Sequence, residues 1–484
     1  MPPSFRNGFA SHPTLTLTRS SKCGSQLSRW KERAFSGSLA VLFFCAYASV
    51  SVRLHQRMLT NSYDLGIFEQ TVRSYANGNL PIVELKGHNY PELGDHFSPI
   101  LATLAPLYKV WPSPLVLLVA QAGLFALSII PLTCWAYRVL GAVPALTIGA
   151  SYGASWGLAS AVGFDFHEIA FAVPLLSCSL CALGQGKFRT SALWSLPLLL
   201  VKEDLGVTTA AIGGLIIWKG NRRWGLAALV SGFIASVLEI FFIIPATSPS
   251  GRYAYLSNFP AENSGPVQSI YQTVESFLDA PETKLITLTL LLAPCAFLAL
   301  GSSLALVAVP TLTWRFASDN PLYWGHGYQY SAALMPIVFA AMIDVLCRRT
   351  ARNRIRGLTL LIMLGVTAAI FPHFPMRQLF QQQFWRTPSR VEVAHQIFRL
   401  IPDGDSVSAS NKLAPQLTSR TTVTLFGFGD TRISTRWIII DVAQRSWPVN
   451  SGQRNQLIRD ARNRGYETVV SQDGFLLLRR AGNS

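Results

Sequence analysis

The sequence predicts an α-helical integral membrane protein with about eleven transmembrane helices and a small C-terminal α/β domain on the outer face. Half of the 484 residues are hydrophobic and only 14% are charged, which is typical of membrane proteins and not of soluble ones. Apolar runs that approach the length of a bilayer span recur up to residue 372, and none occurs after it. The chain therefore divides into a membrane domain and a polar C-terminal domain.

Eleven apolar segments are candidate spans, although several are shorter than the roughly 20 residues that a crossing helix needs. The pair 190–201 and 204–218 flanks Lys202 and Glu203, which predicts two short spans or one broken helix. The apolar stretch 97–110 contains two prolines, so we expect a half-helix at the membrane interface. The eleven segments are 35–52, 113–134, 139–160, 169–185, 190–201, 204–218, 224–245, 284–299, 301–316, 330–347 and 357–372.

The positions of the basic residues orient these segments. If the N-terminus is cytoplasmic, every inner segment except the short one near Gly301 is basic, and Glu32 is their single acid. Membrane topology thus explains the net charge of +16, and nucleic acid is not expected as a partner. The predicted parts are a cytoplasmic basic tail at 1–34, a transmembrane domain at 35–372 with functional outer loops at 53–112, 161–168, 246–283 and 317–329, and an extracytoplasmic domain at 373–484.

The C-terminal domain is predicted to mix short strands with helices. Alternating apolar residues and β-branched side chains indicate strands, whereas apolar residues at helical spacing indicate helices. The predicted strands are 406–410, 422–426, 437–441, 468–471 and 475–479, and the predicted helices are 391–400 and 453–464.

Ionisable residues gather at the outer ends of the apolar segments, and the first outer loop holds Asp64 and Glu69. Such groups cost several kcal/mol in lipid, so their collection at one surface indicates a site. Apolar neighbours such as Tyr63 and Ile67 would dock Asp64 against the helices and raise its basicity. On a helix, Glu69 would point roughly 140° away from Asp64. The alternative role for Asp64 is that of a helix cap.

Two further clusters combine carboxylates with histidine. Asp95 precedes His96, and such a pair can orient an imidazole, bind a metal or hydrogen-bond a sugar, although Asp95 is equally well placed to cap the following helix. Asp165, His167 and Glu168 lie where a span ends outside, so a role in binding a polar ligand or a metal competes with interfacial packing. No spacing here is diagnostic of a metal site, and a divalent metal stays open as a cofactor.

Cationic and polar residues at the same face are candidates for binding a phosphate. Lys202 follows a short apolar run, and either contacts phosphate at membrane depth or forms an internal salt bridge. Arg315 near the end of another span, and His326 with Gln329 in the next loop, have the same two alternatives.

Five short segments resemble a family of predicted prokaryotic membrane proteins, domain of unknown function 2079, and the resemblance covers roughly residues 40–480. The segments are 62–70, 94–99, 105–108, 408–415 and 439–441.

This resemblance implies membership of the GT-C superfamily of integral-membrane glycosyltransferases, which generally take a sugar from a polyprenyl-phosphate lipid. It implies that Asp64 is the acid of the first outer loop and the base of an inverting transfer, with Glu69 as the second candidate. The lipid phosphate would then meet Lys202, Arg315 or His326. Asp165, His167 and Glu168 would hold the sugar, or a metal if there is one. The implied partners are membrane lipid, a lipid-linked sugar donor, and a glycan, lipid or protein acceptor in a prokaryotic cell membrane.

Two other functions compete with this interpretation. A transporter of a polar or lipid-linked solute would explain a broken helix beside Lys202, but the sequence contains no inverted repeat. A non-catalytic membrane scaffold would use its outer domain to bind a partner, and Asp64 would then only cap a helix. Sugar transfer that depends on Asp64 distinguishes an enzyme from both.

Overall fold

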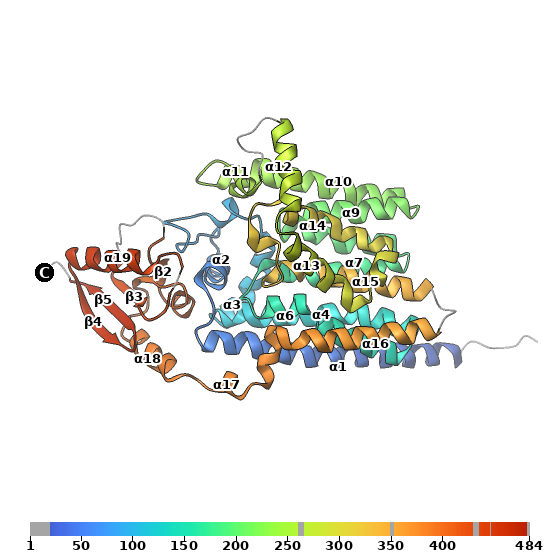
Figure 1. The fold of residues 1–484 in the computed structure, drawn as a ribbon, viewed down its shortest axis with the longest axis horizontal. Coiled ribbons are helices and arrows are strands. Elements are labelled where there is room, and N and C mark those ends of the chain that lie inside the picture. Colours follow the sequence, from blue (N-terminus) through green and yellow to red (C-terminus); the bar gives the residue numbers. More distant parts are fainter. Residues whose placement is uncertain (1–19, 260–265, 349–352, 429–434, 446, 482–484) are drawn as a thin grey trace, which may run out of the picture.

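A bundle of helices with a small sheet domain at one end makes up the protein (Figure 1). The structure is a computed structural model that describes residues 20–259, 266–348, 353–428, 435–445 and 447–481. The long helices run side by side along the longest axis of the molecule, and the strands lie together beyond their ends (Figure 1). We call the end of the bundle that carries the strands the sheet end.

Each of the eleven predicted segments is helical over all or part of its length. In the described part of the chain, five helices are long and apolar enough to cross a membrane, and four apolar helices are shorter. The number of crossings therefore stays a prediction. The five long helices are Trp30–Gln56, Leu115–Leu140, Arg222–Thr247, Gln329–Arg348 and Arg356–His373, and the shorter ones are Pro99–Val110, Glu168–Gly184, Leu205–Trp218 and Ser303–Ala317.

The bundle is centred on α4, α7 and α15, whose apolar side chains form its main core. Phe125, Leu132, Leu176 and Phe339 are all buried in this core. α1 packs along α4, and α9 packs along α10. The bundle helices are α1 Ser20–Gln56, α4 Leu115–Leu140, α5 Ala142–Gly153, α6 Trp156–Val162, α7 Ala172–Gly184, α8 Phe188–Ser195, α9 Leu205–Trp218, α10 Arg222–Leu238, α11 Ile244–Thr247, α12 Pro266–Leu278, α13 Pro281–Leu292, α14 Val309–Ala317, α15 Leu334–Arg348 and α16 Asn353–Ile370.

Three features differ in detail from the sequence expectation. α1 already includes residues 20–34 of the predicted basic tail, while residues 1–19 of that tail lie outside the described part. The predicted span 139–160 divides into α5 and α6 at Ala154 and Ser155. The interruption expected beside Lys202 is confirmed, because the short helix Leu196–Leu200 ends there and α9 begins at Leu205.

The contact between α9 and α10 depends on glycine. A Cβ atom on Gly213 would lie 2.3 Å from the Leu229 amide nitrogen and 2.7 Å from the Gly225 carbonyl oxygen, whereas a Cβ on Gly214 would meet only the Leu229 side chain at 4.0 Å. Small residues allow such close backbone approach between apolar helices.

We expect Gly213→Ala to destabilise the protein by about 1–3 kcal/mol through overpacking. The matched control Gly214→Ala should leave stability unchanged or raise it by up to about 1 kcal/mol, because alanine favours the helix. Unfolding of both variants in the same detergent measures the difference, and equal effects would contradict the close packing.

The C-terminal domain has a five-stranded sheet with the order β2-β1-β3-β5-β4. β1 pairs in parallel with β2 and β3, while β5 is antiparallel to β3 and β4. The predicted strands and helices are confirmed within a few residues. The elements are β1 Ser406–Ala409, β2 Thr422–Leu425, β3 Trp437–Asp441, β4 Tyr466–Gln472, β5 Phe475–Arg480, α18 Ser389–Phe398 and α19 Ser451–Asn463.

Alternation along β3 gives this sheet two buried faces. Ile439 packs with α18 on one face, and Ile438 and Ile440 pack with α19 on the other. The cluster on the α18 side also contains Met58 and Leu85, which belong to the first loop after α1. The sheet domain and this loop therefore share one hydrophobic core.

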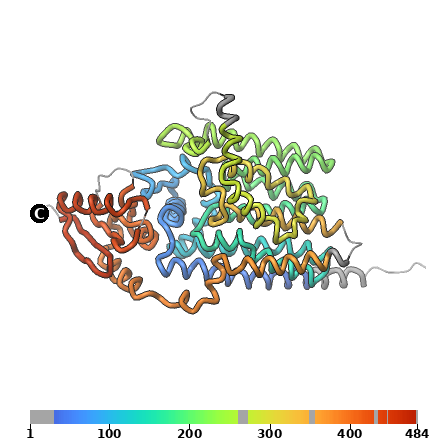
Figure 2. The backbone as a smooth tube through the Cα atoms, in the orientation of Figure 1, coloured from blue at the N-terminus to red at the C-terminus, as the bar shows by residue number. Residues whose placement is uncertain are grey.

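The first loop lies between the bundle and the sheet domain, as the blue trace in Figure 2 shows. It begins with a π-helical turn at Ser62–Gly66 and continues into α2 Ile67–Ala76. The predicted half-helix is present as a 3₁₀ helix, Pro99–Leu104, joined to α3 Ala105–Val110. The loop is thus placed where bundle and sheet domain meet.

Candidate functional site

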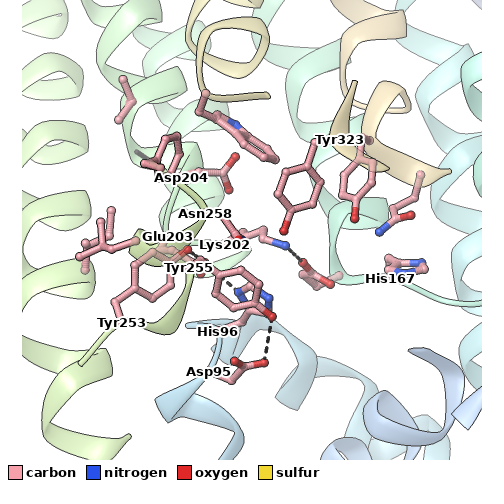
Figure 3. A pocket seen from close by; sticks show the side chains of 18 of the residues that line it. Asp95, His96, His167, Lys202, Glu203, Asp204, Tyr253, Tyr255, Asn258 and Tyr323 are labelled. Atoms are coloured by element: carbon pink, nitrogen blue, oxygen red, sulfur yellow. Dashed lines mark hydrogen bonds and ion pairs between the residues drawn. The ribbon is translucent and has the colours of Figure 1, made fainter. Parts of the chain in front are cut away.

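A cavity of about 630 Å³ opens at the sheet end of the bundle, and ionisable side chains from distant parts of the chain line it (Figure 3). Asp64 and His96 come from the first loop, Lys202 comes from the break before α9, and Tyr255 comes from the loop after α11. Further lining residues come from the segment before α7, from α14 and from the loop after it.

The cavity has a polar side and an apolar side. The apolar side is formed by Val207 of α9, Ile240 and Leu256, and by Val309 and Pro310 at the start of α14. All of these residues except Leu256 belong to apolar helices. The cavity therefore offers charged groups and a hydrocarbon-like wall to the same ligand.

Asp64 and His167 form a pair on the polar side. Asp64 Oδ1 lies 3.0 Å from His167 Nε2, and the His167 side chain is only 6% exposed. His167 Nδ1 is buried without a hydrogen-bond partner in the described residues. Because a carboxylate only accepts hydrogen bonds, Nε2 is the donor in the pair of His167 with the Asp64 carboxylate.

The neighbouring Asp165 does not line the cavity but holds the segment that precedes Asp64. Its Oδ2 accepts hydrogen bonds from the Asn61 backbone N–H at 3.0 Å and from the Asn61 side chain at 2.8 Å. Burial and the nearby Asp64 carboxylate raise the pKa of Asp165 well above its ordinary value. Asp165 thus ties the segment before Asp64 to the bundle.

Lys202 is a cation held at the wall of the cavity. Its Nζ lies 2.8 Å from Glu168 Oε1, and the Lys202 side chain is 21% exposed while that of Glu168 is 3% exposed. The internal salt bridge considered from the sequence is therefore present, and the lysine also faces the cavity. Its ammonium can reach a ligand without leaving Glu168.

His96 and Glu203 form a second acid–histidine pair. Their Nδ1 and Oε1 atoms are 2.8 Å apart, and Glu203 also accepts hydrogen bonds from the Phe97 N–H at 3.2 Å and the Tyr253 hydroxyl at 2.7 Å. Burial opposes ionisation of Glu203, but His96, Lys202 and the Tyr253 hydroxyl together outweigh it and lower the pKa of Glu203 to about 2. Tyr255 stacks on the His96 ring at 4.4 Å between centroids (Figure 3).

Lys86 joins Glu92 and Asp95 in the same wall. Its Nζ lies 2.8 Å from Glu92 Oε2 and also contacts Asp95 Oδ2, which accepts a longer hydrogen bond from the Tyr255 hydroxyl at 3.3 Å. Burial alone would raise the pKa of Asp95, but the Lys86 ammonium, with His96 and the Tyr255 hydroxyl, lowers it to about 2. Asp95 is therefore ionised and committed to this lysine.

The structure brings seven of the predicted site residues into the cavity lining and leaves four outside it. Those in the lining are Asp64, Asp95, His96, His167, Glu168, Lys202 and Gln329. Those outside it are Glu69, Asp165, Arg315 and His326.

Two of the four outlying residues are fully buried. Glu69 is 0% exposed and accepts a hydrogen bond from the Tyr108 hydroxyl, and burial raises its pKa. Arg315 is also 0% exposed, and its guanidinium donates to backbone carbonyls of Tyr323 and Gly325 at 2.8 and 3.0 Å. Both side chains are thus engaged in holding neighbouring segments together.

The lining residues with ionisable side chains that had no role in the sequence expectation include Lys86, Glu92, Glu203, Asp204, Tyr253 and Tyr255. Glu203 adjoins Lys202 and could have been included on that ground. Lys86 and Glu92 lie in the first outer loop between the two recognised clusters, where a charged pair six residues apart gives no periodic signal. Tyr253 follows a span without any accompanying charged motif other than Arg252.

Among the described residues, no three His, Cys, Asp or Glu side chains are grouped so that they could hold a metal ion. Five of the carboxylates that line the cavity have lysine or histidine partners, whereas Asp204 forms no ion pair and its Oδ1 is buried without a hydrogen-bond partner in the described residues. Carboxylates, imidazoles and ammonium groups are thus the charged or titratable groups that the paired residues supply to the cavity.

Comparisons with known proteins agree with this architecture. The crystal structure of ArnT from Cupriavidus metallidurans bound to undecaprenyl phosphate is similar over 92% of this chain and 98% of its own, with 12% sequence identity and a TM-score of 0.54. That likeness confirms the GT-C-like membrane fold. No curated protein matches the chain. A family model described as "Predicted membrane protein (DUF2079)" matches residues 54–477. Because this match covers most of its length, the chain belongs to the DUF2079 family of predicted membrane proteins.

Proposed function

We propose that this protein is an integral-membrane glycosyltransferase that moves a sugar from a polyprenyl-phosphate-type lipid to an acceptor at the sheet end. One observation carries the proposal: a single cavity combines the Asp64 carboxylate, the Lys202 ammonium and an apolar wall along α9 and α14. A lipid-linked sugar needs each of these, because it has a reacting anomeric carbon, an anionic leaving group and a hydrocarbon tail. The ArnT structure, which has a similar fold, is described as bound to undecaprenyl phosphate.

In the proposed reaction, Asp64 removes the proton from the acceptor hydroxyl while the oxygen of that hydroxyl attacks the anomeric carbon of the sugar. The new bond joins the acceptor oxygen to this carbon, and the bond from the carbon to the lipid phosphate oxygen breaks. The leaving phosphate keeps the electron pair. Lys202 is the cation that would stabilise the resulting charge, with Lys86 as a second ammonium in the wall.

His167 has the supporting role of holding the Asp64 carboxylate in one orientation through its Nε2 atom. Asp64 is preferred to Glu69 as the base because Asp64 lines the cavity, whereas Glu69 is buried outside it. The charge distribution predicts that the sheet end is extracytoplasmic, so the acceptor would be a glycan, lipid or protein on that side.

The purified protein in lipid vesicles is expected to transfer radiolabelled sugar from a polyprenyl-phosphate donor to an added membrane acceptor. Parallel reactions with a polyprenyl-diphosphate sugar and with a soluble nucleotide sugar would define the donor class. Protein-free vesicles are the control. A transporter would instead move the labelled donor across the bilayer without forming product, and that result would overturn the proposal.

A further inference from the structure

Asn61, which precedes the π-helical turn with Asp64, and Ser62, which begins it, are held from opposite sides. On the bundle side, Asp165 accepts two hydrogen bonds from Asn61. On the sheet side, Asn411 accepts from Ser62: the Ser62 N–H lies 2.8 Å from the Asn411 carbonyl oxygen and 3.0 Å from its Oδ1. The Ser62 hydroxyl also donates to the same Oδ1 at 2.6 Å.

These bonds satisfy groups that the turn itself leaves unpaired. The first N–H groups of any helical turn have no partner within it and need an acceptor from elsewhere. The turn begins at Ser62, and Asn61 in the capping position makes no side-chain cap of its own. Because Ser62 is fully buried, water cannot replace Asn411 as the acceptor. Asn411 therefore acts as the cap of this turn from the other domain.

Asn411 is itself rigidly placed by the sheet. It follows β1 by two residues and contacts Ser62 of the first loop. The preceding residue, Ser410, donates its N–H to the Ile439 carbonyl at 3.0 Å and accepts from the Asp441 N–H at 3.0 Å. The position of Asn411 is thus fixed by the pairing of β1 with β3.

The rest of the interface places the first loop against the same domain. Gln70 donates to the Val423 carbonyl at 3.0 Å, and Arg73 donates to the Thr421 carbonyl at 3.2 Å. Ile67 and Leu85 belong to the hydrophobic cluster of the sheet domain. These contacts fix the loop as a whole, whereas Asn411 acts two residues from Asp64.

We propose that Asn411 is a positioning residue through which the sheet domain holds Asp64 in its reactive orientation. This rests on the proposed function, because the orientation matters only if Asp64 acts as the base. The sheet domain is then a structural part of the active site and not a separate binding module. Replacing Asn411 with alanine keeps the backbone carbonyl that accepts from the Ser62 N–H, but it removes the Oδ1 that accepts from both the N–H and the hydroxyl of Ser62. This loss would loosen the turn and let the Asp64 carboxylate leave His167.

The test compares Asn411→Ala with Asn450→Ala, which removes the cap of α19 inside the sheet domain but no bond to the first loop. Asn411→Ala is expected to lower kcat by about 10- to 100-fold, because small misplacements of a reacting group have effects of this order. KM for the lipid donor should not change. Asn450→Ala should keep the kcat of the wild type. An unchanged kcat in Asn411→Ala, or an equal fall in Asn450→Ala, would overturn the proposal.

A double-mutant cycle separates positioning from a general loss of structure. If Asn411 acts through Ser62, Ser62→Ala should lower kcat little further in a protein that already carries Asn411→Ala. Full additivity of the two changes would contradict this route.

Hydrogen exchange gives a readout that does not depend on transfer. In Asn411→Ala, the amides of 62–66 should exchange at least about tenfold faster while those of β3 stay protected. Unchanged exchange at 62–66 would refute the claim that the Asn411 side chain holds the turn. If the wild type transfers no sugar but exchange in Asn411→Ala is faster, the proposed function is refuted. The role of Asn411 in holding the turn is then still supported.

Discussion

Replacing Asp64 with Asn is expected to lower the rate of sugar transfer by about 10²- to 10⁴-fold, the usual effect of removing a general base. The asparagine side chain keeps the shape of aspartate, and its carbonyl oxygen can still accept the hydrogen bond from His167 Nε2 that Asp64 receives at 3.0 Å. Only the ability to take up a proton is lost. Single-turnover transfer in vesicles measures this step apart from product release, and KM for the donor should change little.

Glu84→Gln is the matched control for this prediction. Glu84 is an acid of the same loop, but it lies outside the cavity lining and bonds to its neighbours His88 and Asn89. The control should transfer sugar at the wild-type rate. Full activity of Asp64→Asn would instead exclude Asp64 as the base and shift attention to Glu69.

Local features of the sequence were sufficient to predict the elements of the fold. Apolar runs, strand alternation and the charges at 202–204 each extend over a few neighbouring residues, so the helices, the strands and the break before α9 could be placed without tertiary information. The clustering of acids at one end of the apolar segments also predicted where the cavity lies, because charged groups avoid lipid.

The partners within the site could not be predicted in this way. Lys202 pairs with Glu168 and not with the adjacent Glu203, which pairs instead with His96. Each choice depends on how helices far apart in the chain pack together. Asn411 illustrates the same limit, since no local pattern indicates that the end of β1 caps a turn almost 350 residues earlier.

Lys202 and Arg315 show most clearly why burial has to be seen in the structure. Both are basic residues beside apolar runs, and the sequence predicts the same phosphate-binding role for each. In the structure Lys202 faces the cavity, whereas Arg315 is enclosed by the loop that follows α14. We therefore expect replacement of Lys202 to weaken donor binding and replacement of Arg315 to lower stability, although the two residues have similar sequence surroundings.

Arg315→Met is expected to destabilise the protein by at least about 3 kcal/mol, since each buried acceptor left without a partner costs about 1–3 kcal/mol. The guanidinium donates to the carbonyls of Tyr323 and Gly325 and, at 3.1 Å, to the Ser331 hydroxyl, so its removal strands several buried acceptors at once. Methionine fills most of the volume but supplies no donor. Unfolding in detergent, followed through exposure of buried cysteines, measures the loss.

The matched variant is Lys202→Met combined with Glu168→Gln, which removes the cavity cation and the charge of its buried partner together. Since the Glu168 carboxylate is then not left as an unpaired buried charge, this variant should unfold close to the wild type. It should, however, raise KM for the lipid-phosphate donor at least about tenfold, because a charge-assisted contact to a phosphate contributes about 1.5–3 kcal/mol. A stable Arg315→Met protein with weakened donor binding would reverse the two roles and place the phosphate at Arg315. An unstable Arg315→Met protein, together with a stable Lys202→Met/Glu168→Gln protein that binds the donor weakly, would assign Lys202 to the ligand and Arg315 to the fold.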